Sequence, residues 1–109
     1  MIELFIGNIS NAVVHKILER AVSKELIADK YRKELITSFE IAKKYREKIN
    51  PLNRPLPNKD VEYIRTKIIN KVRAELMTRI SKGYKNIELS LVEELVDKAL
   101  KNTDVSEAK

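Results

Sequence analysis

Apolar residues recur every three or four positions between Val61 and Lys82, and this spacing predicts an amphipathic α-helix. The apolar positions are Val61, Ile64, Ile68, Ile69, Val72, Leu76 and Ile80. Gly83 follows directly and is placed to adopt the left-handed conformation that often ends a helix. Asn58 or Asp60 is expected to cap the start of this helix with its side chain.

A second long helix is predicted from Ser23, its candidate cap, to about Ile49. Its apolar face comprises Ile27, Ala28, Tyr31, Leu35, Phe39, Ala42, Tyr45 and Ile49. This spacing is close to a heptad repeat, which is typical of helices that pack along their length. At about 1.5 Å per residue such a helix spans roughly 40 Å, which favours a helical hairpin or bundle.

Two shorter helices are predicted on either side of these long ones. The first covers residues 11–22, with Ser10 or Asn11 as its cap. The other runs from Leu91 to about Lys101, because Ser90 and Glu93 have the spacing of a capping box. His15 falls at the edge of the first of these helices, where a partly exposed structural histidine is expected.

Three prolines separate the two long helices. Pro51, Pro55 and Pro57 lie within residues 50–60, where they remove backbone donors and disfavour a helical conformation in the residues before them. The segment is therefore predicted to be a stiff elbow. A proline-rich docking motif is the alternative, but the required PxxP spacing is missing.

Residues 1–8 are harder to interpret. Ile2, Leu4 and Ile6 alternate, whereas Phe5 is out of step, so a short strand, an extended arm and a frayed helical turn all remain open. A strand needs a partner for its backbone groups. Residues 86–91, which also alternate, or a second copy of the chain can supply that partner.

These elements together predict an all-α, four-helix bundle-like domain. Two long antiparallel helices, joined by the Pro-rich elbow, are its main feature. The predicted domain covers residues 1–102, and residues 103–109 are polar and predicted to be a disordered tail.

Composition restricts the possible classes of protein. A chain of 109 residues corresponds to one domain, and it contains no cysteine, so disulfides and thiolate metal sites are excluded. No apolar run approaches the roughly 20 residues needed to cross a bilayer, and residues 1–8 lack the features of a signal peptide. We therefore expect a cytoplasmic protein. The absence of glutamine and tryptophan and the abundance of isoleucine, lysine and glutamate favour a thermophilic source.

The charge is unevenly distributed. The chain carries a net charge of +6, but residues 43–85 contain thirteen lysines and arginines against four acids, so the middle of the chain is strongly basic between mildly acidic ends. This pattern indicates an anionic partner, of which nucleic acid is the commonest. A solvated, lysine-rich thermophilic surface is the alternative.

Seven basic residues are the candidate contacts to a DNA or RNA backbone. They are Lys44, Lys48, Arg54, Lys67, Lys71, Arg73 and Lys82. Few aromatic side chains are free to stack on bases, so any binding is expected to be electrostatic and independent of sequence.

Two arginines fall within the apolar face of the helix predicted from residue 61 to residue 82. A guanidinium needs a partner there, because burying an unpaired charge is costly. Glu75 precedes Arg79 by one helical turn, whereas Arg65 can pair with Glu62, Asp60 or an acid on another helix. The alternative places them in an interface with another protein, where arginine is enriched. On this hypothesis the partner-binding residues are Arg65, Arg79, Ile69 and Leu76.

Catalytic signatures are absent from the sequence. Glycine occurs only at positions 7 and 83, which excludes a glycine-rich phosphate loop, and His15 is the only histidine. Glu94 and Asp97 have a spacing that is used to hold magnesium, but the second acidic pair that such a site requires is missing. We expect no metal, no cofactor and no enzymatic activity.

The function predicted from these features is that of a non-catalytic accessory subunit. It docks on a larger protein complex, which itself handles nucleic acid, and it makes sequence-nonspecific phosphate contacts. The alternative is a homodimeric helical protein with a structural or interaction role and no nucleic-acid binding.

Overall fold

The computed structural model describes residues 1–22, 24–49, 56–103 and 105 of the chain. Its α-helices are α1 (Ile2–Ala21), α2 (Glu25–Ile49), α3 (Asn58–Ser81) and α4 (Val92–Asn102), and a short 3-10 helix, η1 (Leu89–Leu91), precedes α4. Within these residues no strand is present, so the predicted all-α fold with four helices is confirmed.

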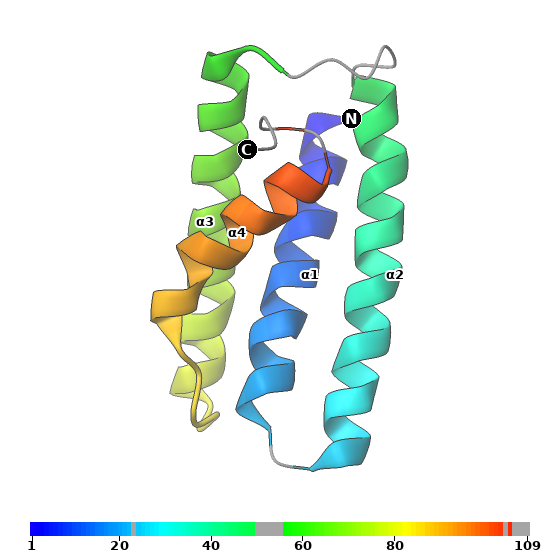
Figure 1. The fold of residues 1–109 in the computed structure, drawn as a ribbon. Helices are drawn as coiled ribbons and strands as arrows, with labels where there is room; N and C mark the ends of the chain where they lie inside the picture. The colour runs from blue at the N-terminus through cyan, green and yellow to red at the C-terminus, as the bar shows by residue number, and fades with distance from the viewer. Residues whose placement is uncertain (23, 50–55, 104, 106–109) are drawn as a thin grey trace.

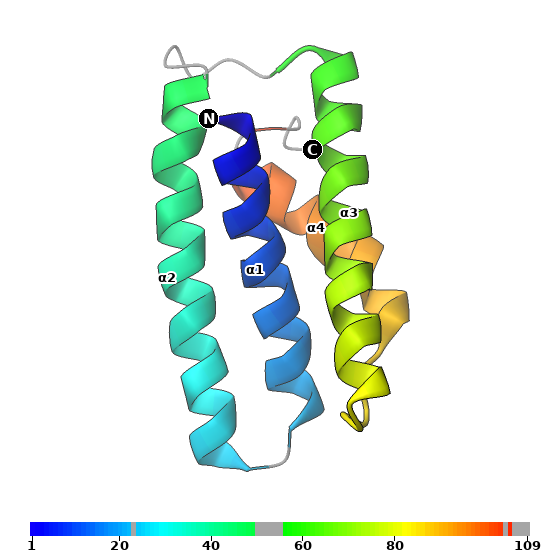
Figure 2. The ribbon, with the colours of Figure 1, turned by 180° about the vertical axis from the view of Figure 1, so that it is seen from behind.

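The helices are arranged around α1. This helix lies between α2 and α3, and α4 crosses one face of the three-helix layer obliquely (Figures 1 and 2). α1 packs against each of the other α-helices, α2 packs against α1, and α3 packs against α1 and α4. The two long helices therefore lie on opposite sides of α1 instead of forming the central pair. Residues 50–55 of the predicted elbow lie outside the described residues, while Leu56 is buried in the core.

The prediction of a helix over residues 11–22 preceded by a separate segment is wrong, because α1 begins at Ile2. Phe5, Ile6 and Ile9 are fully buried. They lie on the same apolar side of α1 as the buried residues Val13 and Ile17. A mid-helix glycine costs roughly 0.5–1 kcal/mol relative to alanine. Gly7 lies within α1, but the packing of α1 against three other helices outweighs this local cost, since most helical stability in proteins comes from packing.

The core is built mainly from α1, α3 and α4. Its largest fully buried side chains are Phe5, Ile6, Ile9, Ile17, Leu18, Ile64, Ile68, Leu76, Leu100, Val72, Val92 and Val96. α2 contributes less, because only Ser38, Ala42 and Arg46 are buried along its length. Tyr31 and Phe39 of the predicted α2 face are only partly buried against this core.

Polar contacts join α2 to α1 on one side of the pair. Asn11 donates to the Ser38 hydroxyl at 2.8 Å. The His15 ring lies 2.7 Å from the Asn11 carbonyl oxygen through Nδ1 and 2.6 Å from Glu34 through Nε2. His15 is buried instead of partly exposed as predicted, and its role is to bridge the two helices.

The helix ends confirm one prediction and correct two others. Gly83 has a φ of 101°, and the Tyr84 amide donates to the Arg79 carbonyl at 3.1 Å, which is the Schellman arrangement that ends α3. The capping box at Ser90 is not formed: α4 is entered through η1, and no side chain caps it. α3 likewise begins after Pro57 without a side-chain cap.

The predicted disordered tail needs correction at two positions. Thr103 and Val105 are both buried, and the Thr103 hydroxyl donates to the Ala99 carbonyl at 2.8 Å. Val105 belongs to the main core cluster, and its amide donates to the Leu100 carbonyl at 2.9 Å. The folded domain therefore extends past residue 102; residues 104 and 106–109 lie outside the described residues.

Within the described chain, no helix combines the length and the apolar character required to cross a bilayer.

Candidate functional site

Arg65 is neutralised inside the chain. Its Nε donates to Oδ1 of Asp97 at 2.8 Å, and a terminal guanidinium nitrogen donates to Oδ2 at 3.4 Å, so the contact is bidentate. This hydrogen bond to Asp97 raises the pKa of Arg65, although burial opposes it. Asp97 lies on α4, and it is the acid from another helix that the sequence left unidentified.

Arg79 is also held within the chain. Its Nε donates to Glu75 Oε1 at 3.0 Å, and its guanidinium lies 5.4 Å from the centre of the Tyr84 ring. Burial alone would lower the pKa of Arg79, but the hydrogen bond to Glu75 and its charge raise it overall. The predicted pair with Glu75 is therefore present.

Burial, followed by the charge of Tyr84 and a hydrogen bond to it, raises the pKa of Tyr31 on α2.

The predicted partner-binding face is not a free surface. Leu76 is 0% exposed and Ile69 is 5% exposed, because both pack in the core that α3 forms with its neighbouring helices. Since Arg65 and Arg79 pair with acids of the same chain, these four residues contribute to the fold, and the hypothesis that they bind a partner gains no support from this packing. The arginines lie at the edges of the interior, where α4 or a neighbouring turn supplies a partner.

The Arg65–Asp97 pair makes a testable contribution to stability. In a double-mutant cycle with Arg65→Ala and Asp97→Ala, we expect a coupling of about 0.5–1 kcal/mol, because the two side chains are half-exposed but bidentate. Urea unfolding followed by circular dichroism measures this coupling. The Lys98–Glu94 pair, one turn apart on α4, is the control, with about 0.3–0.5 kcal/mol. No coupling between Arg65 and Asp97 at low salt would contradict the assignment.

Five of the seven predicted nucleic-acid contacts have no acidic partner in the described part of the chain. Among the described residues, no acid lies within ion-pair distance of Lys44, Lys48, Lys67, Lys71 or Lys82. The sixth, Arg73, contacts Glu93 of α4 at 3.5 Å. The seventh, Arg54, lies outside the described residues.

The unpaired lysines of α3 lie away from α4. Arg65 and Arg73 face α4, as their contacts to Asp97 and Glu93 show. At 3.6 residues per turn, Lys67 and Lys71 fall on a different side of α3, and Lys82, the C-cap residue that follows its last turn, continues their line. We call these three residues the α3 lysine row. Lys67 also lies 5.7 Å from the centre of the Tyr63 ring, whose hydroxyl donates to Glu3 at 3.0 Å.

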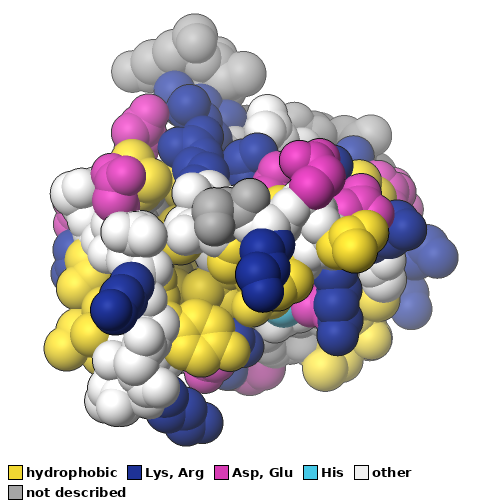
Figure 3. Space-filling model, turned by 90° about the horizontal axis from the view of Figure 1, so that it is seen from below, with side chains coloured by type: hydrophobic (Ala, Val, Ile, Leu, Met, Phe, Trp, Pro, Cys, Tyr) yellow, Lys and Arg dark blue, Asp and Glu magenta, His cyan; other side chains and the backbone are white. Residues whose placement is uncertain are grey.

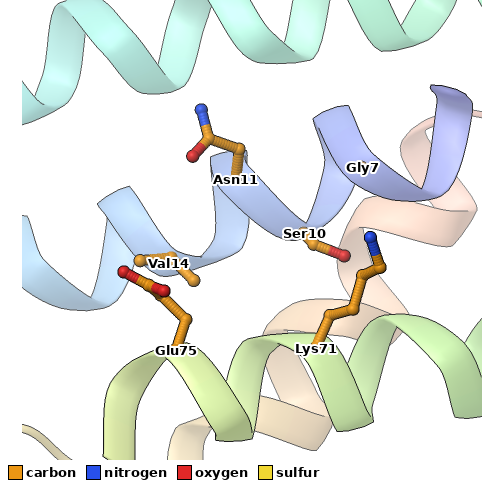
Figure 4. A pocket seen from close by; sticks show the side chains of 6 residues that line it. All are labelled: Gly7, Ser10, Asn11, Val14, Lys71 and Glu75. Atoms are coloured by element: carbon orange, nitrogen blue, oxygen red, sulfur yellow. The ribbon is translucent and has the colours of Figure 1, made fainter. Parts of the chain in front are cut away.

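A polar hollow of about 270 Å³ adjoins this row, between α1 and α3. Figure 4 shows Lys71 and Glu75 reaching from α3 toward α1, while Asn11 points away toward α2. Gly7 borders the hollow, and beyond its chain neighbours and the backbone of its own helical turns no described atom lies within 4 Å of the position that a Cβ would occupy there. The Ser10 hydroxyl, also at its edge, is buried without a hydrogen-bond partner among the described residues.

No protein-family model, curated protein or solved structure matches this chain. Its function is therefore inferred from its own side chains. Within the described residues, no group of three or more histidine, cysteine or acidic side chains is placed to hold a metal ion.

The basic character does not extend uniformly over the molecule. Figure 3 views the end formed by the α1–α2 connection and the last turn of α3, where lysine and arginine side chains alternate with acidic and hydrophobic ones. Leu26, Met77 and Tyr84 are among the exposed hydrophobic side chains of the chain. The α3 lysine row reaches this end through Lys82, whereas Lys67 and Lys71 lie along the side of α3.

The sequence identified the charged residues and the Glu75–Arg79 pair, but not the pairs between helices. Lys71 and Glu75 are one turn apart on α3, yet Glu75 pairs with Arg79, and no acid among the described residues pairs with Lys71. The hollow beside Lys71 was not predicted, because it depends on Gly7 and Ser10 of α1 lying against α3. The spacing of residues within one helix does not show which side chains of another helix lie against it.

Proposed function

We propose that this protein is a non-catalytic binding module that contacts the phosphate backbone of nucleic acid without reading its sequence. The observation that carries the proposal is the set of five lysines on α2 and α3 that lack an acidic partner in the described part of the chain. An ammonium without an intramolecular partner is free to displace the counterions that condense on a nucleic acid. The net charge of +6 favours the same association over longer distances.

The α3 lysine row is the centre of the proposed contact. Lys71 borders the polar hollow, which gives a phosphate oxygen room to approach its ammonium group. Lys44 and Lys48 on α2, which lies on the other side of α1 from α3 (Figures 1 and 2), are further candidate phosphate contacts, and Arg54 is a candidate on its charge alone. The Arg73–Glu93 contact at 3.5 Å joins two exposed side chains, so it is weak enough for Arg73 to exchange Glu93 for a phosphate.

The proposal includes docking on a larger protein assembly, as an accessory subunit in the cytoplasm. Arg65, Arg79, Ile69 and Leu76 do not serve this contact, because their side chains are used within the fold. A protein partner must therefore use a different surface. The absence of cysteine is compatible with a reducing compartment.

Fluorescence anisotropy with labelled single-stranded and duplex DNA and RNA tests the nucleic-acid contact. If five phosphates are contacted, the affinity for a duplex falls by about 10²–10³-fold between 50 and 200 mM salt. The triple variant Lys67→Glu, Lys71→Glu and Lys82→Glu is expected to reduce the slope of log affinity against log salt by about 2.7.

The matched control variant changes the same number of charges elsewhere. Lys33→Glu, Lys43→Glu and Lys98→Glu alter exposed lysines of α2 and α4 that lie outside the α3 lysine row. We expect this variant to keep the salt slope of the unmodified chain. Equal losses in the two variants would show that only net charge matters, and no binding to any of the probes at the lower salt concentration would refute the proposal.

A homodimer without a nucleic-acid role is the second candidate. It is favoured by the large aliphatic side chains that α2 leaves exposed, with Leu26 at 87% and Ile36 at 55%. Two such helices can pack together along their length. Sedimentation equilibrium distinguishes the candidates, because a monomeric mass at high concentration excludes the dimer while leaving the lysine contact intact.

A further inference from the structure

An apolar groove of about 190 Å³ lies between α2 and α4, with α1 beneath it. Val13 of α1, Leu35 and Phe39 of α2, and Leu95 and Ala99 of α4 supply its apolar lining. Unlike the hollow beside Lys71, this groove exposes mostly carbon, and it lies where α4 crosses the three-helix layer (Figure 1).

The groove exists because α4 leaves the apolar face of α2 incompletely covered. α4 packs against α1 and α3, whereas α2 packs against α1. Phe39 consequently remains only partly buried, although it belongs to the apolar face of a 25-residue helix. A helix laid beside α2 and α4 would bury Leu35 and Phe39 and complete the packing around α1.

Lysines of three helices lie at or near the groove. Lys16 lines it from α1 and Lys98 from α4, and the Lys43 ammonium lies 5.0 Å from the centre of the Phe39 ring. Each pairs with an acid of its own helix at 3.4–3.9 Å, and the side chains of Lys16, Lys43 and Lys98 are 38%, 47% and 63% exposed. Such exposed pairs contribute little, so an acid on an incoming partner can replace the intrahelical one.

We propose that this groove binds an amphipathic helix of a partner protein that carries acidic residues beside its apolar face. It is the docking site that the proposed accessory function requires, and in that sense it rests on that function. An apolar floor with basic edges fits such a helix, because its side chains at i, i+3, i+4 and i+7 fill the floor while flanking carboxylates meet the lysines. A second copy of this chain fits less well, since both copies carry a net charge of +6.

The probe is a synthetic helical peptide with leucines at i, i+3, i+4 and i+7 and glutamates on both flanks. A second peptide has the same leucines but lysines in place of the glutamates. In ¹H–¹³C methyl spectra, the acidic peptide is expected to shift the signals of Val13, Leu35 and Leu95, which line the groove, more than those of Val72, which is buried in α3. Absence of these shifts at millimolar peptide, or shifts confined to other surfaces, overturns the proposal.

Charge exchange gives the decisive comparison. The variant Lys16→Glu plus Lys98→Glu is expected to weaken the acidic peptide about tenfold and to strengthen the lysine peptide by a similar factor. Phe39→Ala is expected to weaken both peptides. If both variants bind both peptides as the unmodified chain does, the groove is not the site.

The two proposals fail separately. The α3 lysine row variant should bind the acidic peptide as the unmodified chain does, because none of its three residues lines the groove. The groove variant should retain the salt slope for nucleic acid. Peptide binding without nucleic-acid binding would support the groove proposal and refute the nucleic-acid contact. Nucleic-acid binding without peptide binding would refute the groove proposal only.

Discussion

Replacing Phe5 with alanine is expected to lower the free energy of unfolding by about 3–5 kcal/mol. Phe5 is fully buried at the start of α1, in the same core cluster as Ile64 and Val96 of the other helices. Its removal takes away apolar burial and leaves a cavity that the surrounding helices can only partly close. A small domain has a total stability of about 5–15 kcal/mol, so the loss is a large share of the total. Urea unfolding followed by circular dichroism measures it.

Leu4→Ala is the matched control for Phe5→Ala. Leu4 is the preceding residue in the same helical turn, but its side chain is 49% exposed, so we expect a change within about 0.5 kcal/mol. If the two variants were equally stable, residues 1–8 would behave as a loose arm and not as part of the core. This comparison therefore tests the largest difference between the sequence interpretation and the fold.

Replacing Leu76 with alanine is expected to destabilise the domain by about 2–5 kcal/mol. Leu76 is fully buried on α3 and packs in the main core. The neighbouring Met77 is 53% exposed, and Met77→Ala should change stability by no more than about 0.5 kcal/mol. Thermal and urea unfolding of the two variants provide the measurement.

The Leu76 comparison also decides between two roles for this face of α3. A residue that binds a partner is expected to lose binding on truncation while the free protein stays stable. A residue inside the core loses stability instead. An unchanged midpoint of unfolding in Leu76→Ala would restore the partner-binding hypothesis for this face.

Local patterns were sufficient for three of the four helices. The predicted segments 23–49, 61–82 and 91–101 correspond closely to α2, α3 and α4. Their apolar spacing repeats over several turns, and a periodic signal of that length depends only on residues near one another in the sequence. Gly83 was identified for the same reason, since a helix that ends in a turn with positive φ needs a residue without a Cβ.

The start of α1 was missed because its local signals conflict. Alternating Ile2, Leu4 and Ile6, together with Gly7, favour an extended or broken segment. The helix forms because α2, α3 and α4 surround α1 and bury Phe5 and Ile6. Ser90 illustrates the opposite case, in which a favourable local motif is not used because the chain enters α4 through η1.

The candidate site divides in the same way. The basic residues were found from charge alone, but whether a charge is free depends on acids brought in by the fold. Glu75, four residues before Arg79, was a predictable partner. Asp97 was not, because it is 32 residues from Arg65 in the sequence and reaches it only through the packing of α4 against α3.

The sequence by itself determined that this chain is helical, basic and rich in lysines along its two longest helices, because helical periodicity and charge are properties of neighbouring residues. Only the tertiary structure decided which helix is central, which arginines are neutralised, and where α2 is left incompletely covered. Those outcomes depend on contacts between segments far apart in the chain. Their energies are set by burial and by the distance between opposite charges, and both quantities are defined only once the helices have packed.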